Sequence, residues 1–197
     1  SHLPECLAAL DAQTFRAFET IVVDNASTDE SRDWLRANAP GVRLIERQDT
    51  GGFSLAVNAG IAAAAGEYVV LLNNDTRVDP GWLEALVVAL DAHPAYDFAA
   101  SLMVLYADPD TVNAAGDYYD IVGMVGKNRG IFEPVGAFLQ PVRVLGACAG
   151  AAAYRAGFFE DVGLFDEEFF LTSEDTDINL RALIAGKKCL YVPGARV

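Results

Sequence analysis

Basic residues are scarce in this chain. Its 197 residues include 14 Lys and Arg against 28 Asp and Glu, which gives a formal net charge of −14 at pH 7. Nucleic-acid binding depends largely on the neutralisation of phosphates by Lys and Arg, so the composition argues against a nucleic-acid partner. A ligand that carries phosphate would need a cation to screen it from the protein. Most surface carboxylates serve solubility.

Cysteines and long apolar runs are also few. The three cysteines, Cys6, Cys148 and Cys189, lie far apart without metal-ligand spacing, which predicts reduced, buried thiols in a cytoplasmic protein. No run reaches the roughly 18 apolar residues of a membrane span, and the N-terminus lacks a signal-peptide pattern. We therefore expect a soluble chain, and its 52% of hydrophobic residues suffices for a sizeable core.

The most informative stretch is residues 68–76, Tyr-Val-Val-Leu-Leu-Asn-Asn-Asp-Thr. Its unbroken apolar run predicts a strand buried on both faces in a mostly parallel sheet, where ligands bind at the carboxyl ends of strands. Asn73, Asn74 and Asp75 stand at that end and offer the oxygen ligands that a hard cation such as Mg²⁺ prefers. An Asx-rich turn that satisfies its own backbone fits the same residues. Both interpretations stay open.

Two further segments follow the same order of strand and helix. Residues 19–24 form a predicted strand that ends at Asp24, and Ser27 with Glu30 has the spacing of a capping box for a helix over 28–38. Gly51 and Gly52 precede an alanine-rich helix, either as simple turn formers or to let a ligand approach free backbone N–H groups. Neither a Walker loop nor a dinucleotide-binding motif is present, so an NTPase and a dehydrogenase are disfavoured.

A second acidic cluster lies near the C-terminus. Glu174, Asp175 and Asp177 open a helix predicted over 173–185, after a looser region at 107–142 read as short antiparallel pieces. The helix dipole favours acids in a first turn, which accounts for one of the three. Another has the chemistry of a general base. Helix geometry separates Asp175 from Glu174 and Asp177 but does not say which face meets a substrate.

Taken in order, these segments resemble the family-2 nucleotide-sugar glycosyltransferases of the GT-A fold, most closely the rhamnosyltransferase-like branch. The resemblance implies a three-layer α/β/α fold with a mostly parallel central sheet, in one domain over 1–197. Residues 1–105 would form a nucleotide-binding half and residues 106–197 an acceptor-binding half. The matching segments, in chain order, are residues 22–29, 52–53 with 58, 72–76, 146–147, 163–167, 169–170 and 174–177.

The resemblance also implies an activity and its residues. A sugar would be transferred with inversion from a UDP- or dTDP-sugar to a glycan or lipid-linked acceptor, in cell-surface polysaccharide synthesis. The reaction would take place at the cytoplasmic side of a membrane, and any peripheral membrane association would be made by regions outside this chain. Asp175 would be the base, and Asp75 with Asn73 would hold Mg²⁺ or Mn²⁺. The implied nucleotide-binding residues are Asp24, Asn25, Gly52, Asn58 and Asn74, and the implied acceptor-binding residues are Gly146, Ala147 and Glu174.

The chain departs from the family pattern in three places. Asn73 stands where the metal motif usually begins with Asp. The family opens with a strand of the type Val-Ser-Val-Val-Ile-Pro-Thr-Tyr-Asn, and it often carries a histidine after the segment matched by residues 191–197; this sequence starts after the first and stops before the second. These departures support an alternative, a truncated or degenerate nucleotide-binding domain without catalysis. A sugar-phosphate nucleotidyltransferase is disfavoured, since its basic Gly-rich loop is absent.

Overall fold

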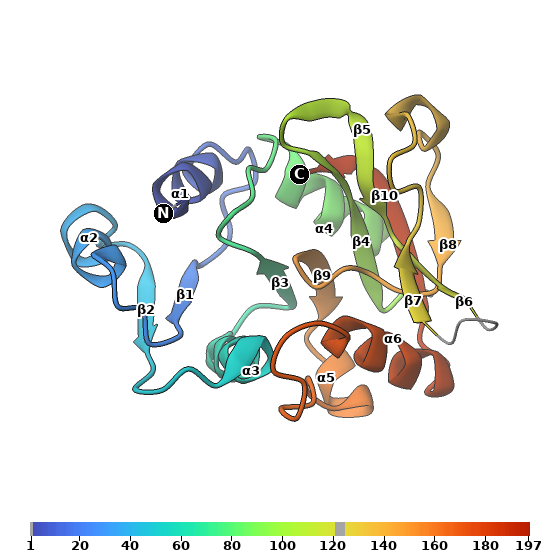
Figure 1. Ribbon diagram of the computed structural model, residues 1–197. Helices are drawn as coiled ribbons and strands as arrows, with labels where there is room; N and C mark the ends of the chain where they lie inside the picture. Colours follow the sequence, from blue (N-terminus) through green and yellow to red (C-terminus); the bar gives the residue numbers. More distant parts are fainter. Residues whose placement is uncertain (1, 121–124) are drawn as a thin grey trace.

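The computed structural model describes residues 2–120 and 125–197. Strands and helices alternate through the first half of the chain, and strands dominate the second half (Figure 1). The helices are α1 (Leu3–Asp11), α2 (Ser31–Asn38), α3 (Gly52–Ala63), α4 (Trp82–Ala92), η1 (Val135–Ala137), α5 (Phe158–Val162) and α6 (Glu174–Ile184). The strands are β1 (Ile21–Asp24), β2 (Arg43–Glu46), β3 (Tyr68–Leu72), β4 (Phe98–Leu105), β5 (Asp108–Ala115), β6 (Asp117–Asp120), β7 (Val125–Asn128), β8 (Val142–Val144), β9 (Ala151–Arg155) and β10 (Cys189–Arg196).

The central sheet has six strands and mixed directions. Its order is β3-β9-β4-β10-β8, and β5 pairs with β4. The β4–β10 pair is parallel, whereas β9 runs antiparallel to both of its neighbours. The expectation of a mostly parallel sheet is therefore wrong for the described pairings, because the alanine-rich β9 enters between β3 and β4 in the opposite direction. The second parallel pair, β1 with β2, forms a separate two-stranded sheet.

β3 begins and ends within a residue of its predicted position, but it is less buried than its apolar sequence suggests. All five of its residues are half-buried. The reason lies in the topology: β3 is the first strand of the six-stranded sheet and, among the described strands, it pairs with β9 alone. The prediction of burial on both faces is thus wrong for this strand, whereas the first five residues of β4 and the first four of β9 are buried.

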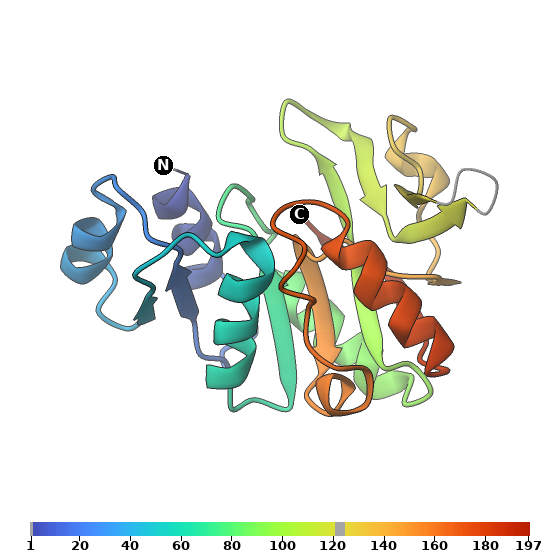
Figure 2. The same cartoon turned by 60° about the horizontal axis from the view of Figure 1, so that its bottom comes forward.

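Helices cover both faces of the sheet, as the predicted three-layer α/β/α arrangement requires. One face carries α4, whose Trp82, Leu86 and Leu90 are fully buried against the strands. The opposite face carries α3, α5 and α6, which lie together in front of the sheet in Figure 2. A smaller cluster joins α1 and α2 around Leu7 and Leu35. No helix in the described residues is long and apolar enough to cross a bilayer.

Residues 107–142 contain the short antiparallel pieces that their sequence predicts. β5 folds back on β4, and β6 pairs antiparallel with β7. The capping box predicted at Ser27 and Glu30 is wrong, because α2 starts at Ser31, three residues after the predicted start of the helix. Asp29 accepts the Ser31 N–H instead, at 3.0 Å, so a neighbouring carboxylate satisfies that backbone group.

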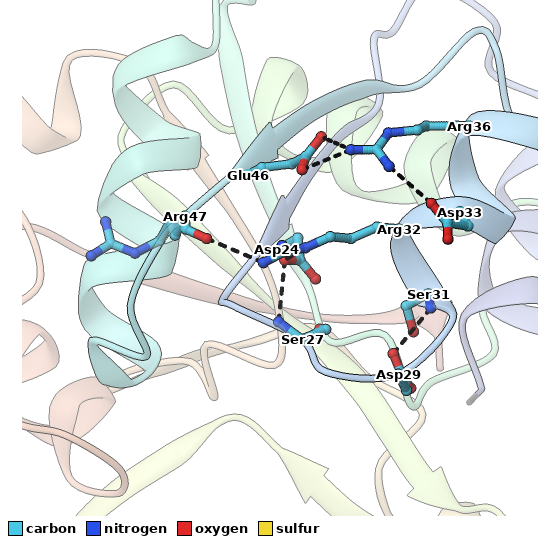
Figure 3. A network of polar contacts seen from close by, with 9 residues as sticks. All are labelled: Asp24, Ser27, Asp29, Ser31, Arg32, Asp33, Arg36, Glu46 and Arg47. Atoms are coloured by element: carbon cyan, nitrogen blue, oxygen red, sulfur yellow. Dashed lines mark hydrogen bonds and ion pairs between the residues drawn. The ribbon is translucent and has the colours of Figure 1, made fainter.

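A buried ion pair ties β1 to α2 (Figure 3). Asp24, the last residue of β1, is 5% exposed and accepts hydrogen bonds from Arg32 Nε and from the Ser27 N–H. Arg32 Nη2 also donates to the carbonyl of Arg47 just after β2, at 3.2 Å. Burial alone would raise the pKa of Asp24, but the hydrogen bonds from Ser27 and Arg32 outweigh it and hold that pKa below its usual value. One guanidinium thus joins α2 to the ends of two strands.

We predict that Arg32→Met lowers the free energy of unfolding by roughly 1–3 kcal/mol, because it leaves a buried carboxylate without its charged partner. Arg36→Met is the matched control on the same helix: its ion pairs with Asp33 and Glu46 lie at the surface and stabilise little. Chemical denaturation measures both. The Asp24 contribution is present above the unfolded pKa near 4 and is lost as the pH falls. A difference from wild type that persists undiminished at pH 2 would contradict the assignment.

Candidate active site

Asn73, Asn74 and Asp75 form an exposed turn directly after β3. The backbone of this turn is held by other groups: the Asn73 N–H donates to the Gly150 carbonyl at 2.9 Å, and the Asn73 carbonyl accepts from the Thr76 hydroxyl at 2.6 Å. Within the part of the chain that the structure describes, no hydrogen bond is made by the three side chains themselves. The side chains do not close the turn, which argues against the interpretation as an Asx-rich turn that satisfies its own backbone. Their oxygens are therefore available to a ligand.

The donors at this turn fit a hard cation that is shared with a phosphate. Mg²⁺ in proteins is commonly held through one or two carboxylates and completed by water and substrate phosphate oxygens. Asp75 supplies one carboxylate, and Asn73 and Asn74 supply amide oxygens. Among the described residues, no group of three or more His, Cys, Asp and Glu side chains is placed to hold a metal. The described residues therefore do not form a metal site by themselves. The carboxylate and the two amides suit a cation that is also bound by a diphosphate.

The glycine turn before α3 is shaped by a neighbouring loop. Gly52 has φ +75°, and a Cβ at this position would lie 2.3 Å from the carbonyl oxygen of Phe170. The same oxygen accepts the Phe53 N–H at 2.9 Å. Asn25, just after β1, braces the turn from the other side, since its amide donates to the Gly52 carbonyl and accepts from the Gly51 N–H. Gly52 is thus required by close packing of two backbones.

Asn58 of α3 is buried and binds residues 165 and 167 through its side-chain amide. Its Oδ1 accepts the Phe165 N–H at 3.0 Å, and its Nδ2 donates to the Phe165 carbonyl at 2.8 Å and to Glu167 Oε1 at 3.2 Å. Both amide hydrogens are therefore used within the protein. Asn58 positions the segment that leads into α6, and its contact with a nucleotide stays a prediction, as it does for Asn25 and Gly52.

The three acids at the start of α6 have different environments. Asp177 accepts hydrogen bonds from Nε and Nη2 of Arg181. Nη1 of Arg181 donates to the Val162 carbonyl, and Nη2 also donates to the Leu164 carbonyl. That carboxylate is committed to a structural ion pair. Asp175 instead accepts the Thr176 N–H at 2.7 Å, and the described residues place no cationic side chain in contact with it. Burial raises the pKa of Asp175, although backbone hydrogen bonds oppose the shift.

Glu174 is 8% exposed, and its Oε2 has no hydrogen-bond partner in the described structure. Burial raises the pKa of this side chain as well. A buried carboxylate oxygen without a donor is rare and calls for a ligand or a function. The sequence left open which face of α6 meets a substrate, and the structure separates Asp177, bound to Arg181, from Asp175 and Glu174, which are not.

Gly146 and Ala147 form a backbone wall against α6. The amide of Asn179 holds Ala147 from both sides, since it accepts the Ala147 N–H at 3.3 Å and donates to the Ala147 carbonyl at 3.0 Å. A Cβ on Gly146 would lie 2.2 Å from the Asn179 side chain, so only glycine fits. Asn179 lies one helical turn after Asp175, a spacing that sequence reasoning could have used and did not.

Asp117 is the residue that sequence reasoning missed. It starts β6, its Oδ2 accepts from Asn179 Nδ2 at 3.3 Å, and its Oδ1 is buried without a partner among the described residues. Burial, and next the charge of Asp175, raise the pKa of Asp117 to about 7. The same carboxylates help to raise the pKa of Cys148 to about 12, chiefly through burial of that thiol. Asp117 thus belongs with Asp175 and Glu174, although 57 residues or more separate them in sequence.

Comparisons with known proteins find similarity to glycosyltransferases. Residues 1–163 match the family model Glycosyl transferase family 2. The N-acetylglucosaminyl-diphospho-decaprenol L-rhamnosyltransferase of Mycobacterium tuberculosis (strain ATCC 25618 / H37Rv) is 31% identical, over 100% of this chain and 71% of that protein. The PGL/p-HBAD biosynthesis glycosyltransferase of Mycobacterium bovis (strain BCG / Pasteur 1173P2) is 27% identical, over 91% of this chain and 63% of that protein.

Solved structures show the same fold. GalNAc-T7, crystallised with UDP, GalNAc and Mn²⁺, superposes with a TM-score of 0.78 at 20% identity, over 99% of this chain and 40% of that one. S. aureus TarS 1-349 in complex with UDP has a TM-score of 0.66 at 19% identity, over 99% and 56%. The chain thus spans about half the length of these structures, and the likeness confirms the predicted GT-A fold. By its family match over residues 1–163 and its 31% identical mycobacterial relative, the chain belongs to glycosyl transferase family 2, with a rhamnosyltransferase-like sequence.

Proposed function

We propose that the chain moves a sugar, with inversion, from a UDP- or dTDP-sugar to a hydroxyl of a glycan or lipid-linked acceptor during cell-surface polysaccharide synthesis, on the cytoplasmic side of a membrane. The observation that carries the proposal is the contrast within the first turn of α6. Arg181 forms an ion pair with Asp177. Asp175 has no cationic partner among the described residues, and it is the carboxylate that the family resemblance assigns as base.

Asp175 has the properties that proton abstraction needs. A base works best when its pKa lies near the operating pH, and burial shifts the pKa of Asp175 upward, in that direction. The carboxylate would take the proton of the acceptor hydroxyl while the hydroxyl oxygen bonds to the anomeric carbon. The bond from that carbon to the diphosphate oxygen breaks, and the nucleoside diphosphate leaves. Attack opposite the leaving group inverts the anomeric centre.

Residues 1–105 would bind the donor and residues 106–197 the acceptor. Asp75 and Asn73 would hold Mg²⁺ or Mn²⁺, and a bound cation would offset the charge that develops on the leaving diphosphate. UDP in two related folds, with Mn²⁺ in one of them, supports a nucleoside diphosphate and a divalent cation here. Asp24 and Asn74 would contact the nucleotide directly, while Asn25, Gly52 and Asn58 would act through the loops that they hold.

The acceptor would lie against Gly146, Ala147 and Glu174. Their neighbourhood supplies a backbone wall fixed by Asn179 and a buried carboxylate oxygen, Glu174 Oε2, that is free to accept a hydrogen bond from a sugar hydroxyl. The mycobacterial relative is named for a lipid-linked sugar acceptor, which supports an acceptor of that type. A peripheral association with the inner face of the membrane is part of the same proposal.

A second candidate function, nucleotide binding without catalysis, is favoured by one observation. β1 and β2 pair only with each other in the described structure, so no strand pairing joins the end of β1, with Asp24, to the six-stranded sheet that carries Asp75. The two candidates differ in whether Asp175 matters for turnover.

We predict that Asp175→Asn, in a full-length protein that contains this domain, lowers the rate of sugar transfer roughly 10²–10⁴-fold and leaves nucleotide affinity unchanged, because a base acts on the acceptor. The control is Asp177→Asn, which breaks the Arg181 ion pair and should lower stability with little effect on turnover. Product formation and the melting temperature of both variants are measured. Near-normal turnover in Asp175→Asn, with a large loss in Asp177→Asn, would show that the wrong carboxylate was chosen.

We predict that UDP or dTDP binds more tightly with Mn²⁺ than without it, and that Asp75→Asn removes most of the difference. The reason is that Asp75 is the one charged ligand at the proposed metal position. Calorimetry with and without Mn²⁺ tests this in wild type and variant. Metal-independent affinity in the wild type would refute the metal site while leaving nucleotide binding intact.

We predict that Asp24→Asn weakens nucleotide binding about tenfold, since a hydrogen bond to a charged group contributes roughly 1.5–3 kcal/mol. Arg32→Met serves as the control, because it breaks the same ion pair but keeps the carboxylate. The dissociation constants of UDP and dTDP are compared with unfolding free energies. Equal losses of affinity in the two variants would mean that Asp24 acts through the fold and does not touch the nucleotide.

A further inference from the structure

Asp117 connects three parts of the candidate site. Its N–H donates to the Gly146 carbonyl at 2.8 Å, and its own carbonyl accepts the Leu145 N–H at 3.2 Å. Its carboxylate oxygen Oδ2 accepts from Nδ2 of Asn179, whose amide also binds the N–H and the carbonyl of Ala147. One residue at the start of β6 therefore joins this backbone segment to α6, which lies next to β7 (Figure 1).

The same carboxylate lies close to the proposed base. Asn179 follows Asp175 by four residues, so the two side chains lie on one face of α6, one turn apart. Burial raises the pKa of Asp117 first, and the charge of Asp175 raises it further. Cys148 is near the whole group, because the charges of Asp117, Asp175 and Glu174 add to the effect of burial on the pKa of its thiol. Asp117 and Asp175 are thus near enough for the charge of each to change the proton affinity of the other.

The carboxylate of Asp117 is largely enclosed by protein. Its Oδ1 is buried without a partner among the described residues, and its Oδ2 is bound to Asn179. The small cavity that Asp117 lines with Thr176 and Asn179 has room for about one water molecule, which is too little for a sugar. Asp117 therefore influences a reaction at Asp175 through the protein groups around it, without a contact to the substrate in this cavity.

We propose that Asp117 is a positioning residue for sugar transfer. Through Asn179 it holds α6 against the backbone of Ala147, and its negative charge makes Asp175 a stronger proton acceptor. The inference rests on the proposed function and adds to it a residue that sets the strength of the base. Two neighbouring negative charges oppose each other, so the two carboxylates titrate as a coupled pair.

The other ionisable groups around Asp117 keep a single charge state near neutral pH. They are two thiols, three phenols, two guanidinium groups and one ammonium group: Cys148, Cys189, Tyr118, Tyr119, Tyr154, Arg129, Arg143 and Lys127, which pairs with Asp120. Burial raises the pKa of Cys148 to about 12 and those of Cys189 and Tyr154 well above their usual values. Phenol, guanidinium and ammonium groups ordinarily titrate at about pH 10 or above. The histidines lie elsewhere, before α1 and after α4, so the charge changes near pH 7 belong to the carboxylates.

The charge of Asp117 has a defined effect on the pH dependence of transfer. In the wild type Asp117 releases its proton near its raised pKa of about 7, and above that pH its charge strengthens Asp175 as a base. The transfer rate should therefore rise through pH 7. Asp117→Asn carries no charge at any pH, so Asp175 should release its proton about one pH unit lower, and the acid limb of the rate profile should move down with it.

The test uses a full-length protein that contains this domain, with ¹³C in the side-chain carboxyl groups of its aspartates. NMR titration gives the pKa of Asp175 in the wild type, in Asp117→Asn and in a control, Asp11→Asn, which removes an exposed carboxylate of α1. We expect Asp117→Asn to lower the pKa of Asp175 by about one unit and Asp11→Asn to leave it unchanged. Each signal is assigned by its loss in the corresponding Asn variant.

A second variant separates the charge from the hydrogen bond. Asn179→Ala keeps the carboxylate of Asp117 but removes a donor to its charged form, so the pKa of Asp117 should rise. The transfer rate is followed from about pH 5 to about pH 9 as the release of UDP or dTDP from the sugar nucleotide. A purely structural role of Asp117 predicts lower stability and lower rates in both variants, with no change in the position of the acid limb.

An unchanged pKa of Asp175 in Asp117→Asn, or a loss of rate without a shift of the acid limb, would overturn the inference. If Asp117→Asn does not fold, Asp175→Asn tests the same coupling from the other side, because the interaction is reciprocal: the pKa of Asp117 must then fall by about one unit. The proposed function is tested separately by turnover of Asp175→Asn. If that variant loses transfer and the pKa coupling is absent, only this inference fails, whereas normal transfer by Asp175→Asn would reject the proposed base itself.

Discussion

The position of α6 depends on one buried amide. Asn58 makes three hydrogen bonds to residues 165–167, which lie 107 or more positions further along the chain. Residues 169 and 170 are held by the start of α3, the helix that carries Asn58. The Ser54 hydroxyl donates to the Phe169 carbonyl at 3.1 Å, and the Phe53 N–H donates to the Phe170 carbonyl. Thr172 and Ser173 then adopt positive φ angles, so the chain turns sharply into α6. Contacts between α3 and residues 165–170 therefore determine the direction in which α6 begins.

Arg181 gives the acids at the start of α6 different environments, because it binds Asp177 and does not bind Asp175 or Glu174. It binds Asp177 and two carbonyls of the preceding loop, which anchors the outer side of α6. Burial raises the pKa values of the other two acids, Asp175 and Glu174, and also that of Asp117. All three carboxylates help to raise the pKa of the Cys148 thiol. Such a group of partly desolvated carboxylates opposes folding, and a folded protein tolerates it mainly where function requires it. Among the described residues, the buried carboxylate oxygens that lack a donor, on Asp117 and Glu174, lie in this group.

Local signals predicted the elements, and long-range contacts decided the rest. The apolar run of β3 and the glycine before α3 placed those elements closely, because each depends on neighbouring residues. Strand direction depends on how distant segments return: nothing within residues 151–155 says that β9 runs antiparallel between β3 and β4. The same holds for the site. Asp175 followed from a family resemblance, whereas Asp117 joins it through a hydrogen bond to Asn179 that spans 62 residues.

The charge of the chain constrains how it can meet phosphate. With 28 acidic and 14 basic residues, a phosphate-bearing ligand is repelled over most of the surface, and the repulsion acts over about one Debye length, near 8 Å at physiological salt. A divalent cation can overcome this repulsion locally. At the carboxyl end of β3, exposed oxygens suit a divalent cation, which reverses the sign of the charge that a diphosphate meets. The acidic composition of the chain is therefore compatible with a diphosphate ligand at this end of the sheet, because a bound cation would neutralise charge on both the ligand and Asp75.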